Sequence, residues 1–92
     1  MAELFNTRCT QGRLIITDTM IIVELGREGA LRQHTLARSA LTGIDTKLVV
    51  PSLFGKGGGT NLIFRGQGAD RVQADLVNPT IAREIVRTLQ GR

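Results

Sequence analysis

The feature that most constrains this chain is the spacing of its short apolar segments. Runs of β-branched and aliphatic residues are interrupted roughly every six to ten residues by Gly, Pro, Asn or Asp. β-Branched residues favour strands, whereas the interrupting residues favour tight turns. This spacing is typical of a meander of antiparallel strands. We therefore predict a mainly β protein with about seven strands, at residues 3–10, 13–17, 20–25, 31–38, 42–50, 60–65 and 71–77.

The C-terminal segment changes to a helical pattern. Asn78 is a suitable N-cap, and Pro79 suits the first helical position because its missing N–H would be unpaired there. Gly91 marks the end. The pattern predicts an amphipathic helix of about eleven residues whose apolar stripe covers the sheet. Its apolar residues are Ile81, Ala82, Ile85, Val86 and Leu89, and Arg83, Glu84 and Arg87 lie on the opposite side.

Length and composition predict one folded domain, residues 1–92. Apolar residues make up 41% of the 92-residue chain and charged residues 22%, which are ordinary values for a globular protein too short for a second core. Because Cys9 is the one cysteine, neither an intramolecular disulfide nor a cysteine-based zinc site is expected. No secretory signal and no apolar run of membrane length is visible. These features predict a reduced, cytoplasmic setting.

Two stretches of the sequence resemble the bacterial pleckstrin-homology-like (PH-like) domain family. Residues 13–23, Arg-Leu-Ile-Ile-Thr-Asp-Thr-Met-Ile-Ile-Val, are similar to the second and third strands of that family. Residues 36–45, Leu-Ala-Arg-Ser-Ala-Leu-Thr-Gly-Ile-Asp, are similar to the junction between its two sheets. A Gly-rich loop, two more strands and an Asn-Pro helix extend the resemblance over the whole chain. It implies a partly open barrel of two near-orthogonal antiparallel sheets, with the helix plugging one end.

The first turn departs from the lipid-binding members of this family. Those members carry a long first hairpin loop with a Lys and paired Arg residues. Here the corresponding turn is Gln11-Gly12, flanked by Arg8 and Arg13, and so short a turn cannot enclose a polyphosphate. The resemblance therefore implies no specific phosphoinositide site. It places any anion contact at the open end of the barrel, near Arg13, Arg27 and Arg32.

No group of residues has the pattern of a catalytic, cofactor or metal site. In the segment 55–60, Lys56 precedes the glycines and the segment leads into a strand, whereas a phosphate-binding loop ends in Gly-Lys-Ser/Thr before a helix. His34, the only histidine, has no recognisable nucleophile, orienting carboxylate or further ligands. Asp45 and Asp75 are lone carboxylates on strands. We predict that the protein is not an enzyme and needs no cofactor or metal.

Charge and aromatic content bear on the choice of partner. The formal charge is +4 at pH 7, but the basic residues are scattered along the chain. Single-strand nucleic-acid binding requires exposed aromatics, and with Phe5 and Phe64 predicted in the core only Phe54 remains. Nucleic acid is therefore not the expected partner. Binding of anionic ligands, lipid headgroup or nucleic acid, through scattered arginines stays open as the alternative.

One predicted strand is more apolar than expected for a sheet with one solvent-exposed face. Met20-Ile-Ile-Val-Glu-Leu25 is apolar on both faces, and residues 14–16 and 48–50 repeat the pattern. We predict self-association through the exposed members of this strand, with Met20, Ile21, Ile22 and Val23 as candidates. The sequence thus predicts a non-catalytic interaction module that binds a protein partner or itself, with weak contact to a membrane surface as a further expectation.

Overall fold

The structure is a computed structural model that describes residues 3–26, 32–50 and 58–90. Its regular elements lie close to the predicted ranges. The strands are β1 (Glu3–Cys9), β2 (Gly12–Thr17), β3 (Met20–Leu25), β4 (Arg32–Ala37), β5 (Gly43–Val49), β6 (Gly59–Arg65) and β7 (Arg71–Val77). A short 3-10 turn, Arg38–Ala40, follows β4, and helix α1 (Pro79–Gln90) ends the chain. The prediction of a mainly β fold with a C-terminal helix is confirmed.

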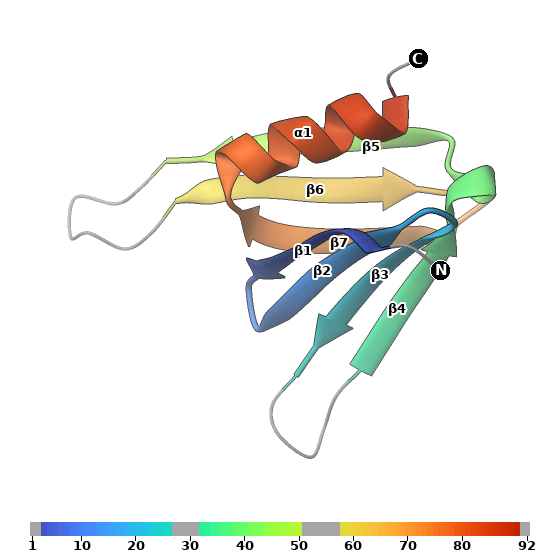
Figure 1. Ribbon diagram of the computed structural model, residues 1–92, viewed down its shortest axis with the longest axis horizontal. Helices are drawn as coiled ribbons and strands as arrows, with labels where there is room; N and C mark the ends of the chain where they lie inside the picture. The colour runs from blue at the N-terminus through green and yellow to red at the C-terminus, as the bar shows by residue number, and fades with distance from the viewer. Residues whose placement is uncertain (1–2, 27–31, 51–57, 91–92) are drawn as a thin grey trace.

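The strands form two antiparallel sheets (Figure 1). One sheet has the order β1-β2-β3-β4 and the other the order β5-β6-β7, and neighbours in the sheet are also neighbours in the chain. The described strands do not close into a continuous barrel. The turn between β1 and β2 is tight because Gln11 adopts φ 63°. At Gly12 a Cβ atom would lie 1.7 Å from the carbonyl oxygen of Glu24, so only glycine lets β2 and β3 pair here.

The core lies between the inner faces of the two sheets and one stripe of α1. Alternate strand residues point inward, so burial alternates along β3 and along the first part of β7. Phe64 is the largest fully buried side chain, and Phe5 and Cys9 pack against the core from β1. The buried apolar residues are Leu14, Ile16, Ile21, Val23, Leu36, Leu62, Phe64, Val72, Ala74, Val77, Ala82 and Ile85.

A bulge interrupts the pairing of β6 with β7. The register shifts between Thr60 and Leu62, and Leu76 adopts the left-handed region at φ 56°. Large side chains avoid this region because of steric crowding. The Oδ1 of Asn61 accepts a hydrogen bond of 2.9 Å from the backbone N–H of Leu76. This contact replaces a ladder hydrogen bond that the bulge displaces.

The segment 51–59, predicted as a Gly-rich loop, is only partly described. Residues 51–57, which include Phe54 and Lys56, lie outside the described residues, as do Arg27 and Leu31. Gly59 belongs to β6 rather than to the loop and is buried. A Cβ at this position would meet the backbone of Leu76 at 2.8 Å, so its glycine is required by close packing at the bulge.

The described helix is too short and too polar to cross a lipid bilayer, and no other helix in 3–26, 32–50 or 58–90 meets the requirements of a membrane span.

Candidate functional site

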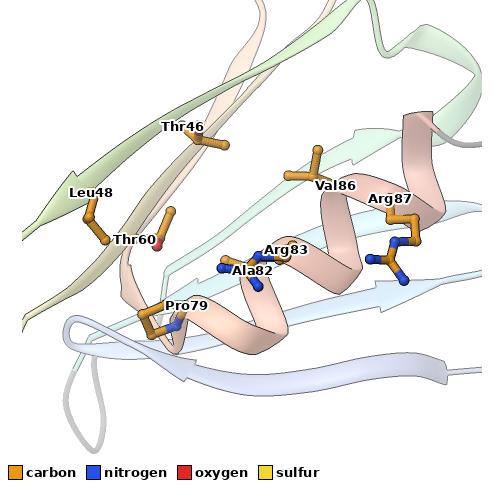
Figure 2. A pocket seen from close by; sticks show the side chains of 8 residues that line it. All are labelled: Thr46, Leu48, Thr60, Pro79, Ala82, Arg83, Val86 and Arg87. Atoms are coloured by element: carbon orange, nitrogen blue, oxygen red, sulfur yellow. The ribbon is translucent and has the colours of Figure 1, made fainter.

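A groove with a largely apolar lining lies between β5 and α1 (Figure 2). Its volume is about 420 Å³, and it is open to solvent. The strands contribute an aliphatic side chain and two threonines, and the helix contributes three apolar residues and two arginines. The lining residues are Thr46, Leu48, Thr60, Pro79, Ala82, Arg83, Val86 and Arg87.

The strand side of the groove exists because α1 does not cover the inner face of β5. Thr46 lies opposite Leu62 and Leu48 lies opposite Thr60, so both share the inner face with the core residues of β6. Ile44 packs against the core from the same face. Residues 45–48 are nevertheless all exposed, and the Leu48 side chain retains 66% of its accessible surface. An aliphatic residue on an inner face is thus left in water.

The helix side of the groove is a second stripe on α1. Pro79, Ala82, Arg83, Val86 and Arg87 follow the spacing i, i+3, i+4, i+7 and i+8, which places them along one side of a helix. This stripe adjoins the core-facing residues Ile81, Ile85 and Leu89. Helical periodicity places the arginines on the side opposite the core. Periodicity does not say what lies next to a helix, so the position of Arg83 and Arg87 beside the groove comes only from the structure.

The groove is positively charged at its helix side. The Nη1 of Arg87 lies 3.6 Å from the Oε1 of Glu84, and both side chains are more than 45% exposed. Such exposed pairs contribute little to stability. Arg83 has no ion-pair partner among the described residues. The groove therefore offers an apolar floor beside two arginine side chains that are accessible to an acidic ligand.

The strand that borders the groove is also an edge of its sheet. Among the described strands, β5 is paired with β6 on one side and has no strand on the other. An edge strand presents backbone N–H and C=O groups that can pair with a further strand. The unpaired edge and the groove lie side by side along β5.

Two of the three predicted anion-binding arginines lie within the described residues, on different strands of the first sheet. Arg13 lies opposite Glu24 on one face of the first sheet, whereas Arg32 lies opposite Leu25, whose side chain points to the other face. The Nη1 of Arg13 donates a hydrogen bond of 2.7 Å to the Oδ1 of Asn6. Arg27 lies outside the described residues. Arg13 and Arg32 therefore lie on opposite faces of the first sheet, and anion binding by these arginines stays a prediction.

The predicted self-association strand is divided between the core and the surface. Ile21 and Val23 are fully buried in the core and cannot contribute to an interface. Met20 and Ile22 point to the outer face of the first sheet and are half-buried. Ile22 lies opposite Ile15, which is also half-buried. The candidates of β3 that reach the surface are thus Met20 and Ile22, and Ile15 of β2 lies beside them.

A second hollow, of about 590 Å³, lies beside the turn between β6 and β7. Arg65 and Arg71 line it and lie opposite each other in the sheet. The Nε of Arg65 is 3.0 Å from the Oδ2 of Asp45, and the Asp70 residue also lines the hollow. The positive and negative charges therefore balance here, unlike in the groove beside α1.

The remaining candidates for chemistry stand apart from one another. Within the described ranges, no three His, Cys, Asp or Glu side chains gather into a metal-binding group. His34 is exposed on β4. Burial raises the pKa of the Cys9 thiol, and the charge of Asp75 raises it further. Because the thiolate is the reactive form of cysteine, this environment makes Cys9 a poor nucleophile.

Comparison of the chain with protein-family models, with curated proteins and with solved structures gives no match. The groove therefore has to be interpreted from its own geometry.

Proposed function

We propose that this protein is a non-catalytic interaction module that binds an extended segment of a protein partner along β5, in the groove beside α1. The observation that carries this proposal is the exposure of Leu48 on the inner face of a strand whose outer edge is unpaired. Both the exposed leucine and the unpaired edge favour contact with another chain. A bound strand would cover both of them at once.

Strand addition explains how one ligand uses both features. An extended segment pairs its backbone with the free edge of a sheet, while alternate side chains enter the neighbouring groove. The backbone pairing supplies affinity with little dependence on sequence, and the groove supplies specificity. Covering an aliphatic side chain of this size contributes roughly 1.5–3 kcal/mol when it is wholly exposed beforehand, and Leu48 is exposed over 66% of its surface.

Membership of the PH-like family is part of this proposal. The resemblance implies two antiparallel sheets and a C-terminal helix, and the chain has sheets of four and three strands followed by a single helix. A fold of this kind supports many functions, so the site rather than the fold carries the functional argument.

Selection from a displayed library of random peptides, with the purified domain as bait, tests the proposal. Selected peptides should perturb the backbone amide NMR signals of β5 and of the groove side of α1. Leu48→Glu should abolish binding, because it places a charge in the apolar floor. Leu4→Glu is the matched control, because Leu4 is also an exposed leucine, 47% accessible, but lies on the other sheet. Perturbations confined to other surfaces, or equal effects of the two variants, would contradict the proposal.

Self-association is a second candidate, favoured by the Ile15–Ile22 pair on the outer face of the first sheet. A wet sheet face normally carries polar residues, so paired isoleucines there suit a partner surface. Sedimentation across micromolar concentrations should show a species larger than 10.0 kDa. Ile22→Glu should return it to a folded monomer, and Thr35→Glu, a neighbour of Ile22 at the exposed edge strand β4, should weaken it less. A monomer throughout would exclude this candidate.

A further inference from the structure

The spacing of the two groove arginines carries information about the ligand. Arg83 and Arg87 are four residues apart on α1, so they project from successive turns and line the same groove (Figure 2). With a rise of 1.5 Å per residue, their Cα atoms are separated by about 6 Å along the helix axis.

This spacing matches the repeat of an extended chain. A strand rises about 3.3 Å per residue, and its side chains alternate between two faces, so residues i and i+2 share a face at a separation of about 6.6 Å. A ligand that runs along β5 therefore presents two consecutive groove-facing side chains at nearly the separation of the two arginines. Thr46 and Leu48 of β5 line the same groove as five residues of α1. In the view of Figure 1 the axes of β5 and α1 are close to parallel, which the alignment requires.

The two ends of the groove differ chemically. Leu48 and Thr60 lie near the end of β5 and the start of β6, where the helix begins with Pro79. Arg83 and Arg87 follow further along the helix. A ligand side chain beside Leu48 and Pro79 meets an apolar surface, whereas the next two on the same face meet guanidinium groups. The groove is thus apolar at one end and positively charged further along, and the side chains of the ligand must follow the same order.

We infer, resting on the proposed function above, that the bound segment carries two acidic residues at positions i and i+2, preceded at i−2 by an aliphatic residue. Antiparallel pairing with β5 sets this order, because β5 and α1 run in opposite directions and the ligand then runs with α1. Antiparallel pairing is also the commoner arrangement in sheets. The ligand class is an acidic, aliphatic strand rather than a basic or a wholly apolar one.

Glu84 provides a separate test of the role of Arg87 in ligand binding. Its carboxylate lies 3.6 Å from Arg87 and competes with an acidic ligand for that guanidinium. Removing its charge should therefore strengthen ligand binding, which a merely structural role of the arginines would not produce. Glu84 is exposed on the helix, so Glu84→Gln should leave the fold intact.

The test uses labelled synthetic peptides and fluorescence anisotropy with the full chain. One peptide has the order aliphatic-Thr-Asp-Thr-Asp, and its control places the two acids at adjacent positions, so that they face opposite sides of the strand. Arg83→Gln and Arg87→Gln should each weaken the first peptide by about two- to fivefold, as expected for exposed ion pairs. Arg71→Gln, an exposed arginine on the outer face of β7, should have no effect.

Further measurements identify which ligand groups the two arginines recognise. Affinity for the first peptide should fall as salt increases, because accessible ion pairs are screened. Glu84→Gln should raise affinity, and the peptide with adjacent acids should bind more weakly than the first. Equal affinity for the two peptides, or an equal loss with Arg71→Gln, would overturn the inference. The inference would also be overturned if anionic vesicles or single-stranded oligonucleotides bound more tightly than the peptide and lost this binding in the Arg83→Gln and Arg87→Gln variants.

The two proposals fail in different ways. One outcome would overturn the inference and leave the proposed function standing. In that outcome, peptides without acidic residues perturb the NMR signals of β5 and lose binding with Leu48→Glu, but the arginine variants do not change their affinity. Selected peptides that never perturb β5 would overturn the proposed function itself.

Discussion

The backbone N–H of Thr10, just after β1, donates a hydrogen bond of 2.8 Å to the carbonyl oxygen of Asp75 in β7. This bond joins the two sheets directly. Asp75 precedes Leu76, whose left-handed backbone forms the bulge, and the bulge frees the Asp75 carbonyl from the regular ladder. The bulge therefore makes the Asp75 carbonyl available for a direct backbone bond between the two sheets.

Asp75 also affects Cys9, which precedes Thr10 in the chain. Burial is the larger cause that raises the pKa of its thiol above the ordinary value of 9.0, and the charge of Asp75 is the smaller one. The folded protein thus holds the thiol proton more tightly than the unfolded chain. The resulting stability is fully present below the unfolded pKa and is lost as the pH rises through the folded pKa.

We therefore expect the wild type to lose more stability between about pH 7 and pH 10 than Cys9→Ala does. Urea unfolding at the two pH values measures the difference, and groups shared by both proteins cancel in the comparison. The thiol should also react more slowly with a disulfide reagent in the folded protein than in urea. Identical pH dependence in the two proteins would show that the thiol does not titrate differently on folding.

Ile85→Ala should destabilise the domain by roughly 2–4 kcal/mol, because it removes a fully buried side chain and leaves a cavity. Thermal or urea unfolding measures the loss. Thr88→Ala, at an exposed position on the same helix, is the control and should change stability by less than about 0.5 kcal/mol. Equal effects of the two variants would show that α1 does not pack as described.

The N-terminus of α1 depends on Asn78. Its Oδ1 accepts hydrogen bonds from the backbone N–H groups of Thr80, at 2.9 Å, and Ile81, at 3.3 Å. Asn78→Ala should cost about 1 kcal/mol in the free energy of unfolding, because these donors lose their partner. Asn78→Asp should retain most of the stability, since a carboxylate also accepts both bonds. If Asp restores nothing, the side chain does not act as a cap.

Two glycines should respond differently to alanine. At Gly12 a methyl group would collide with the Glu24 backbone, and relieving the collision requires β2 and β3 to separate. Gly12→Ala should therefore cost about 3 kcal/mol or more. At Gly68 there is open space and the cost is conformational, because φ is +68°, so Gly68→Ala should cost about 1–2 kcal/mol. Urea unfolding of both variants should show this order.

Local patterns were sufficient to predict the elements. The stripe of Ile81, Ile85 and Leu89 predicts a buried face, and the structure confirms it because the pattern is a property of the helix's own geometry. The alternation in 71–77 predicts Val72, Ala74 and Leu76 on the core face. Val72 and Ala74 are buried, but the bulge exposes Leu76 and buries Val77 in its place.

The strand 20–25 was also placed correctly from its own local pattern. Two of its four candidate self-association residues, Ile21 and Val23, form the core. Self-association through Met20 and Ile22 stays a prediction.

By itself, the sequence determined which segments are strands, where the helix begins, and which side of each element is apolar, since these depend on residues near one another in the chain. Only the tertiary structure decided that Arg13 and Arg32 lie on opposite faces of a sheet and that Leu48 lines the same groove as Val86, Arg83 and Arg87. Strand pairing and helix docking bring together residues that are tens of positions apart. The groove is a product of that docking, because α1 buries Ile85 against the core and in doing so stops short of β5.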